Sequence, residues 1–214
     1  MVHPKLSDQD FQRLIAKCRS LPSTEDVYLV NDYVENLLET VVNFQLRVTV
    51  VKRALEHYRQ HAQMSTPNFA ALKNLLHAHS DTEQGNLEVA QYLWGYNLWT
   101  RVELLRRLIA YFEAQGVTTQ EQLKQWASQA NFERDFKGKV KGASLAIFNW
   151  LVMRQGVETV KPDIWVHRFI QDVLGYSLSN EMAVQALENV AKEIGIKANE
   201  LDLRIWRYER SRSR

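Results

Sequence analysis

The sequence has few of the residues that cross-link a fold, interrupt helices or anchor a chain in a membrane. Its 214 residues include a single cysteine, Cys18. One cysteine excludes an internal disulfide, a four-cysteine iron–sulfur cluster and a cysteine-built zinc site. No apolar run approaches the roughly 20 residues of a membrane span, and the N-terminal residues are too polar for the apolar core of a secretory signal. We therefore expect a protein of a reducing compartment that has no membrane partner.

Prolines and glycines are also scarce, with four of the former and eight of the latter. Apolar residues recur at intervals of three and four residues almost throughout, which is the period of a helix, and no segment alternates like a strand. The sequence therefore predicts an all-α protein that can bury one sizeable core or two small helical lobes. The expected helices cover residues 7–22, 32–44, 46–61, 68–77, 87–93, 100–115, 119–127, 143–153, 164–174, 179–194 and 199–208, with a polar stretch at 128–141.

The formal net charge of +2 is too small to indicate a nucleic-acid partner, so the distribution of charge matters more. Residues 134–141 contain four basic side chains against one acidic side chain, Asp135. A second concentration is the C-terminal series Arg204, Arg207, Arg210, Arg212 and Arg214. We interpret this tail as a frayed, solubilising end, with phosphate binding as the alternative.

Residues 140–146, VKGASLA, predict a tight turn that leads into a buried helix. Gly142 suits the turn, and the small Ala146 allows another helix to come close. The following residues 145–153, LAIFNWLVM, are apolar nearly all round, which predicts a central helix. Free N–H groups and the positive end of the dipole make a helix N-terminus an anion site. Lys139 and Lys141 would add positive charge to this phosphate site.

This pattern resembles the turn of the helix-hairpin-helix base-excision DNA glycosylase superfamily, in which two glycines two residues apart are followed four residues later by alanine. Gly142 and Ala146 match, whereas Val140 replaces the first glycine. Because a β-branched residue tolerates positive φ poorly, the turn is expected to differ in detail. The resemblance implies DNA as partner and no cofactor beyond a monovalent cation at the hairpin. It assigns DNA binding to Lys139, Val140, Lys141, Gly142, Ala143 and Ser144.

Residues 161–169, KPDIWVHRF, are similar to the second half of the family signature, where the catalytic aspartate opens the next helix. The resemblance assigns catalysis to Asp163 and DNA contact to Arg168. Trp165 replaces the histidine that many members carry two residues after the aspartate. Asp163 follows Pro162 at the start of a predicted helix, so a helix N-cap is a second reading that does not exclude the first.

Two upstream segments extend the resemblance. Residues 43–45, NFQ, are similar to the end of the family's first barrel helix, where a glutamine fills the gap left by an extruded base, and this implies that role for Gln45. Phe44, Tyr96 and Trp165 are candidates for the pocket of the flipped base. The histidine pairs at 57 and 61 and at 77 and 79 lack a third ligand in a recognisable pattern, so we expect no metal site.

Ser144 stands where strand-cleaving members carry a lysine that forms a Schiff base with the sugar. A hydroxyl cannot form that adduct, although Lys141 remains an alternative amine near the turn. The resemblance therefore implies a monofunctional glycosylase that flips a damaged or mispaired base and hydrolyses its N-glycosidic bond. The resemblance is to a branch of the superfamily without the iron–sulfur cluster and without the lyase lysine.

The alternative function is a non-catalytic DNA-binding or protein-interaction member of the same fold, which Val140 and Trp165 favour. The resemblance implies a two-lobed helical fold. Residues 36–155 would form a helical barrel lobe with the hairpin, and residues 1–35 plus 156–214 would form a second lobe carrying Asp163. We expect a monomer that is cytoplasmic and associated with the nucleoid, or nuclear.

Overall fold

The computed structural model describes residues 6–24 and 29–212, and these residues form helices and connecting loops with no strand. The prediction of an all-α protein is confirmed. The chain divides into two compact units, one made of Val30–Gln155 and the other of Met1–Leu29 with Gly156–Arg214. Within the described ranges, no helix is long and apolar enough to cross a bilayer.

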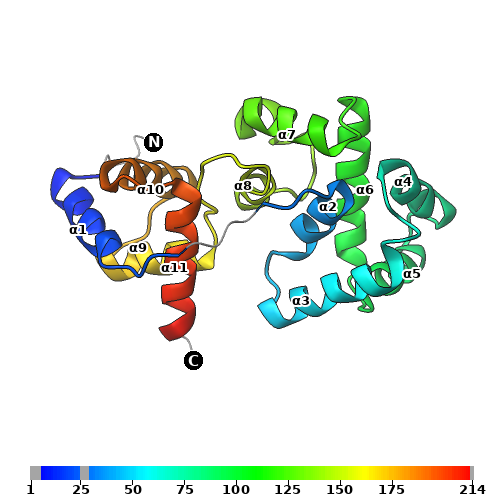
Figure 1. Cartoon of the computed structure of the whole chain (residues 1–214), viewed down its shortest axis with the longest axis horizontal. Coiled ribbons are helices and arrows are strands. Elements are labelled where there is room, and N and C mark those ends of the chain that lie inside the picture. The colour runs from blue at the N-terminus through cyan, green and yellow to red at the C-terminus, as the bar shows by residue number, and fades with distance from the viewer. Residues whose placement is uncertain (1–5, 25–28, 213–214) are drawn as a thin grey trace. The chain divides into compact units, whose positions relative to one another are not determined.

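The larger unit, Val30–Gln155, holds most of the helices (Figure 1). They are α2 (Tyr33–Val42), α3 (Val48–His57), α4 (Phe69–Ala78), α5 (Glu83–Trp94), α6 (Trp99–Ala114), α7 (Gln120–Gln129) and α8 (Leu145–Met153). Two short π-helical turns, η1 (Tyr58–Ala62) and η2 (Phe132–Phe136), complete this unit. The smaller unit contains α1 (Asp8–Arg19), α9 (Ile164–Leu174), α10 (Asn180–Ile194) and α11 (Ala198–Arg212).

Short polar residues fix where most of the helices begin. The side chain of each accepts a hydrogen bond from a backbone N–H of the first turn, which would otherwise lack a partner. Such a cap contributes about 1 kcal/mol compared with alanine. Thr119 goes further, because its partner Gln122 bonds back to the Thr119 N–H and completes a capping box. The capping residues are Ser7, Asp32, Asn68, Thr82, Thr119, Ser144, Asp163 and Ser179.

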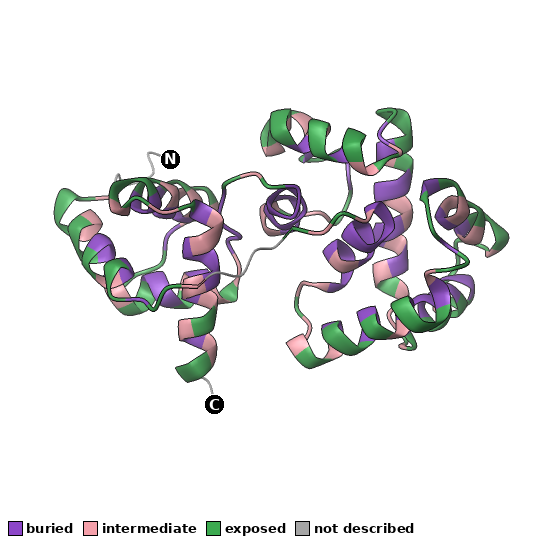
Figure 2. Ribbon diagram, viewed as in Figure 1, coloured by how far each residue is buried: buried purple, intermediate pink, exposed green. Residues whose placement is uncertain are grey.

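Helix α8 is buried within the larger unit, as its all-round apolar sequence predicted, and packs against α2, α7 and η2. Its residues from Ile147 to Met153 are buried, and Figure 2 shows the ribbon of α8 as buried almost all round. Beneath the loop that precedes it, aromatic rings from four elements pack edge to face or tilted against one another, and edge-to-face pairs add to the energy of burial. Neighbouring ring centroids lie 4.9–6.1 Å apart, and the rings belong to Phe112, Trp126, Phe132, Phe136 and Phe148.

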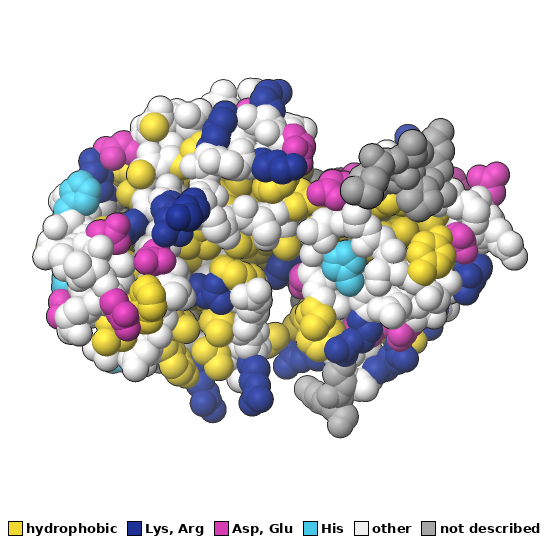
Figure 3. All heavy atoms as spheres, turned by 180° about the vertical axis from the view of Figure 1, so that it is seen from behind, with side chains coloured by type: hydrophobic (Ala, Val, Ile, Leu, Met, Phe, Trp, Pro, Cys, Tyr) yellow, Lys and Arg dark blue, Asp and Glu magenta, His cyan; other side chains and the backbone are white. Residues whose placement is uncertain are grey.

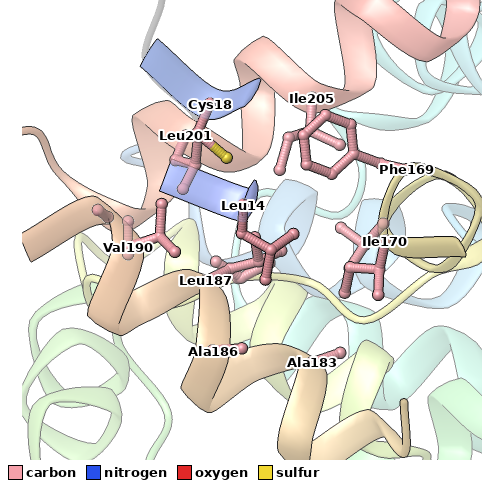
Figure 4. Packing of buried hydrophobic residues seen from close by; sticks show 14 of the residues in the cluster. Leu14, Cys18, Phe169, Ile170, Ala183, Ala186, Leu187, Val190, Leu201 and Ile205 are labelled. Atoms are coloured by element: carbon pink, nitrogen blue, oxygen red, sulfur yellow. The ribbon is translucent and has the colours of Figure 1, made fainter. Parts of the chain in front are cut away.

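The smaller unit has its own apolar core. Leu14 and Cys18 of α1 point toward Phe169 of α9 and Ile205 of α11, with α10 closing the cluster (Figure 4). Burial raises the pKa of the Cys18 thiol to about 12, so this cysteine behaves as a small apolar residue. Each unit therefore buries an apolar core of its own.

The structure corrects two expectations about local structure. The arginine-rich end is not frayed, because α11 continues to Arg212 and places Ile205 and Glu209 in the interior. Arg212 pairs with Asp172 of α9 at 2.5 Å, while Arg214 lies outside the described residues. The polar stretch 128–141, for which no helix was predicted, contains a short helical turn. Phe132 and Phe136 are four residues apart and enter the aromatic cluster, which folds this segment into η2.

Candidate functional site

The loop before α8 consists of two consecutive β-turns. In the first, the N–H of Lys139 donates to the carbonyl of Phe136 at 3.1 Å. Lys137 has φ −58° and ψ 124°, and Gly138 has φ 74°, which are the angles of a type II turn. This turn directly follows η2. Sequence analysis missed Gly138, which supplies the first left-handed position of this loop. The loop, residues 136–143, is called the hairpin.

The second turn repeats this arrangement four residues later. The N–H of Ala143 donates to the carbonyl of Val140 at 3.1 Å, and Gly142 at the third position has φ 89°. Val140 needs no positive φ, because Gly138 and Gly142 take the left-handed positions. The Val140 side chain is buried and its N–H donates to Phe136 at 3.3 Å. Val140 thus supports the hairpin from within, and its side chain is not on the surface.

Three cations lie on the exposed side of these turns. Lys139 and Lys141 are exposed, and no ion pair is found for either of them within the described part of the chain. Arg107 of α6 joins them by donating to the carbonyl of Lys141 at 3.2 Å, and it also pairs with Glu103 of the same helix at 3.5 Å. A Cβ on Gly142 would lie 3.5 Å from the Arg107 Nη1 atom, so the guanidinium touches the turn. Sequence analysis missed Arg107 because it is 32 or more residues away along the chain.

The other basic residues of this segment are neutralised by neighbours. Lys137 pairs with Glu133 at 2.9 Å, and Arg134 pairs with Asp135 at 2.6 Å. The hydrogen bond from Arg134, together with the N–H of Asn131, lowers the pKa of Asp135 to about 2. Of the four basic side chains in 134–141, Lys139 and Lys141 are therefore the two that have no close ion pair.

Ser144 serves as the N-cap of α8. Its hydroxyl accepts a hydrogen bond from the N–H of Ile147 at 3.4 Å, and the residue is exposed. The N-terminus of α8, with its positive dipole end, therefore opens directly beside the two glycine turns. On the face shown in Figure 3, Lys and Arg side chains are mixed with Asp and Glu, so this local geometry is more informative than a general surface charge.

Asp163 is the N-cap of α9, as its position after Pro162 predicted. Its Oδ1 atom accepts from the N–H of Trp165 at 2.9 Å and from that of Val166 at 3.4 Å. Its Oδ2 atom lies 3.6 Å from the Nζ atom of Lys161, and the Asp163 side chain is 23% exposed. One carboxylate oxygen thus fixes the helix while the other remains available at the surface beside an ammonium group.

Lys161 is a third feature that sequence analysis missed, after Gly138 and Arg107. The residue is buried, which is rare for lysine unless the amine has charged or polar neighbours. Its backbone N–H donates to the buried Asp202 of α11 at 2.9 Å. This bond ties the segment before Asp163 to another helix of the same unit. In the sequence, the only sign that Lys161 belongs to the site is its position two residues before Asp163.

The first turn of α9 also exposes an apolar and a basic side chain. Ile164, the residue after Asp163, is 64% exposed. The Arg168 guanidinium lies 5.2 Å from the centroid of the half-buried Trp165 ring, a cation–π contact one helical turn apart. Asp163, Ile164, Trp165 and Arg168 therefore share one end of one helix.

The predicted wedge residue Gln45 lies in the loop between α2 and α3, beyond the end of α2 at Val42. It is exposed and has φ 56°. The preceding Phe44 is half-buried, and the guanidinium of Arg101 lies 3.5 Å from the centroid of its ring. One face of this candidate base-pocket ring is therefore covered by Arg101. Tyr96, in the turn after α5, is half-buried.

The candidate residues are divided between the two units. The hairpin, Gln45, Phe44 and Tyr96 belong to Val30–Gln155, and Asp163, Trp165 and Arg168 belong to the smaller unit. Each set is defined by contacts within its own unit. Among the described residues, no group of three or more His, Cys, Asp or Glu side chains is arranged to hold a metal ion. The ring centroids of His57 and His61 lie 4.6 Å apart, with the ring planes tilted by 44°.

The fold and these two sets of residues define the class: an all-α protein of two units with a glycine-turn hairpin and a helix-capping aspartate. The chain belongs to the family described as Domain of unknown function (DUF8548), whose sequence model matches residues 12–210. No curated protein and no solved structure matches the chain.

Proposed function

We propose that this protein is a DNA glycosylase of the helix-hairpin-helix type, with the two-lobed helical fold of that superfamily. In this proposal it flips a damaged or mispaired base out of the duplex and hydrolyses its N-glycosidic bond. The observation that carries the proposal is the position of the Asp163 carboxylate. This carboxylate is fixed at the N-terminus of α9 by two backbone N–H groups, ten residues after α8 ends.

The hairpin would bind the DNA backbone. Two left-handed glycines bring the chain close to a ligand without side-chain obstruction, and α8 begins immediately behind them. Lys139, Lys141 and Arg107 would pair with phosphates, displacing counterions and making the affinity dependent on salt. Such contacts position the protein on the duplex but do not read sequence.

Asp163 would supply the chemistry. Breaking the N-glycosidic bond leaves positive charge on the sugar, and a fixed carboxylate at 4 Å stabilises such a charge by roughly 4 kcal/mol at an effective dielectric constant near 20. The oxygen that does not cap α9 is the one available for this role. Water then completes hydrolysis at the sugar carbon. Exposed Ile164 and the Trp165 ring, beside Asp163, would contact the flipped nucleotide.

Ser144 would take no part in covalent chemistry. Its hydroxyl caps α8, and a hydroxyl cannot form the Schiff base that strand cleavage requires. The expected product is therefore an abasic site in an intact strand. A monomer acting in the cytoplasm at the nucleoid, or in the nucleus, fits this activity.

The test is base release from duplexes that carry single lesions, scored across a broad lesion panel. Asp163→Asn is the decisive variant, because asparagine still caps a helix but lacks the charge. We expect it to lower the rate of base release by at least 100-fold while DNA affinity stays within threefold of the wild type. Asp172→Asn, on the exposed side of the same helix, is the matched control and keeps full activity. Undiminished base release by Asp163→Asn would refute the catalytic role.

A second candidate is a DNA-binding module without catalysis. The observation that favours it is the Lys161 ammonium, 3.6 Å from the Asp163 carboxylate, which neutralises part of the charge that a sugar cation needs. This function predicts salt-sensitive DNA binding that Lys139 and Lys141 substitutions weaken, with no base released from any lesion. Absence of DNA binding under low salt would exclude both candidates and leave a protein-interaction role.

A further inference from the structure

Gln45 has a backbone conformation that is sterically unfavourable for its residue type. Its φ is 56°, and it is the one non-glycine residue with positive φ in the ranges 6–24 and 29–212. A Cβ makes this left-handed region costly, and glycine is the usual choice there. Such strain persists only where the surroundings hold it, and it concentrates at functional sites.

The side chain of Gln45 does not explain this conformation through the fold. The residue is exposed, and no hydrogen bond of its side chain is found within the described part of the chain. Glycine at this position would relieve the steric conflict without loss of a recorded contact. The chain therefore keeps a long polar side chain at a position where folding alone favours glycine.

Arg101 holds the turn from the first helical turn of α6. Its Nη2 atom donates to the carbonyl of Phe44 at 2.9 Å, and its guanidinium lies 3.5 Å from the centroid of the Phe44 ring. That carbonyl belongs to the peptide group that joins Phe44 to Gln45. The angle φ of Gln45 is the rotation between this peptide plane and the rest of Gln45. Arg101 therefore fixes one of the two groups whose relative rotation is φ of Gln45, and the chain on the other side of Gln45 leads into α3.

The position of Arg101 is electrostatically unusual as well. Burial lowers the pKa of its guanidinium, although arginine remains charged in proteins. No carboxylate is found as its partner among the described residues. A half-buried cation is thus bonded to one neutral carbonyl and one aromatic ring. Only a planar guanidinium makes both contacts at once, because a lysine ammonium cannot stack on a ring as a flat group.

We infer that Arg101 is a positioning residue, which presets the Phe44–Gln45 turn so that Gln45 enters an opened DNA stack without further ordering. The inference rests on the proposed function, because it assigns the turn to base flipping. A loop that is already fixed loses less conformational freedom on binding than a mobile one, which increases affinity for the opened DNA. The strained backbone of Gln45 is formed when the protein folds, so it requires no further free energy when the DNA strands open.

The first experiment tests the restraint without DNA. Gln45→Gly and Gln45→Ala both remove the long side chain, but only alanine keeps the Cβ. We expect the melting temperature of Gln45→Gly to exceed that of Gln45→Ala by about 2–4 °C. In an Arg101→Met background the turn relaxes, and the difference between the two variants falls below about 1 °C. Equal melting temperatures in the wild-type background, or an undiminished difference with Arg101→Met, would overturn the inference.

The second experiment tests whether the Phe44–Gln45 turn helps to unstack DNA. A duplex with 2-aminopurine beside an abasic-site analogue reports unstacking by its fluorescence. We expect Arg101→Met and Arg101→Lys each to lower the equilibrium constant for unstacking about tenfold, and neither to lower it further when combined with Gln45→Ala. Additive effects, or full function of Arg101→Lys, would overturn the inference, since the latter would show that charge alone matters.

The two experiments separate this inference from the proposed function. If the wild-type protein neither binds nor unstacks the duplex, the proposed function fails, and the assignment of the turn to base flipping fails with it. The melting comparison still decides whether Arg101 restrains Gln45. If the wild-type protein unstacks the duplex but the Arg101 variants do so equally well, the proposed function stands and the positioning role is refuted.

Discussion

The ammonium group of Lys161 lies 3.6 Å from the carboxylate of Asp163, with their side chains 10% and 23% exposed. The pair stands where a buried segment meets the N-terminus of α9. Both groups are charged, yet they serve different neighbours: the carboxylate caps α9, and the Lys161 backbone bonds to Asp202. Stability measurements can separate the capping role of Asp163 from its charge.

Substitutions of Asp163 should affect stability and activity differently. Both Asp163→Asn and Asp163→Ala leave the buried Lys161 ammonium without the Asp163 carboxylate, which should lower the free energy of unfolding by about 1–3 kcal/mol. Asp163→Asn keeps a capping oxygen, whereas Asp163→Ala also loses the cap and should be less stable than Asp163→Asn by about 1 kcal/mol. Both should abolish base release equally. Urea unfolding alongside single-turnover assays checks this. Retention of activity in proportion to stability would contradict a catalytic role.

Removal of the Lys161 charge should destabilise the smaller unit. Lys161→Met leaves the partly buried carboxylate of Asp163 without its cation, which we expect to cost about 1–3 kcal/mol. Lys161→Arg keeps the charge and should lose less than half of that amount. Urea titration measures both variants. The exposed Lys192 of α10 is the control, and Lys192→Met should be neutral. Equal stability of all three variants would show that the pair contributes nothing.

The hairpin cations should contribute to DNA affinity according to whether they are already paired. Replacing Lys139 or Lys141 by glutamine should weaken binding equally for all sequences and reduce the slope of log affinity against log salt by about 0.9 each, whereas Arg107→Gln should reduce it less because Arg107 already pairs with Glu103. Lys137→Gln is the matched control, because Glu133 already pairs with Lys137. Fluorescence anisotropy over a salt series measures the slopes. An equal effect of Lys137→Gln would contradict the assignment.

The two hairpin glycines should resist substitution because of their backbone angles. Gly138→Ala and Gly142→Ala each place a Cβ at positive φ, which should cost about 1–2 kcal/mol in the free energy of unfolding. At Gly138 the space around a Cβ is open, so backbone strain acts alone there. At Gly142 a Cβ would be in ordinary van der Waals contact with Arg107 at 3.5 Å, so backbone strain is the main cost there as well. Asparagine, which tolerates this region, should partly rescue both positions in urea titrations.

Glu209 should make stability depend on pH. Burial raises the pKa of this α11 carboxyl above 4.5, with Asp172 adding to the effect and Arg212 and Arg168 opposing it. The folded state therefore binds the proton more tightly than the unfolded state. Its contribution is fully present below pH 4.5 and is lost as the pH rises through the raised value. Glu209→Gln should thus gain stability relative to the wild type as the pH rises toward 7.

Unfolding of both proteins in urea between pH 4 and pH 8 measures this difference. The exposed Glu193 of α10 provides the control, since Glu193→Gln should show no pH-dependent gain. A constant difference between wild type and Glu209→Gln across the range would mean that Glu209 does not titrate differently in the folded protein.

Local sequence signals were sufficient for the helices and for the capping role of Asp163. Apolar spacing at three and four residues, together with a short polar residue at the start of most helices, specified α9 and the other helices to within a few residues. These features depend on neighbours within one helical turn. The all-round apolar run 145–153 likewise required burial, because water would otherwise contact it on every side.

Relationships between distant segments could not be read in this way. Nothing near Gly142 in the chain indicates that Arg107 touches it, and nothing near Gln45 indicates that Arg101 restrains it. Lys161 was passed over for the same reason, since its burial depends on helix α11. The arginines of α11 were misread as a frayed end because their partner Asp172 lies on another helix. Periodicity and caps act within a few residues, whereas pairing of side chains across helices depends on how each unit packs.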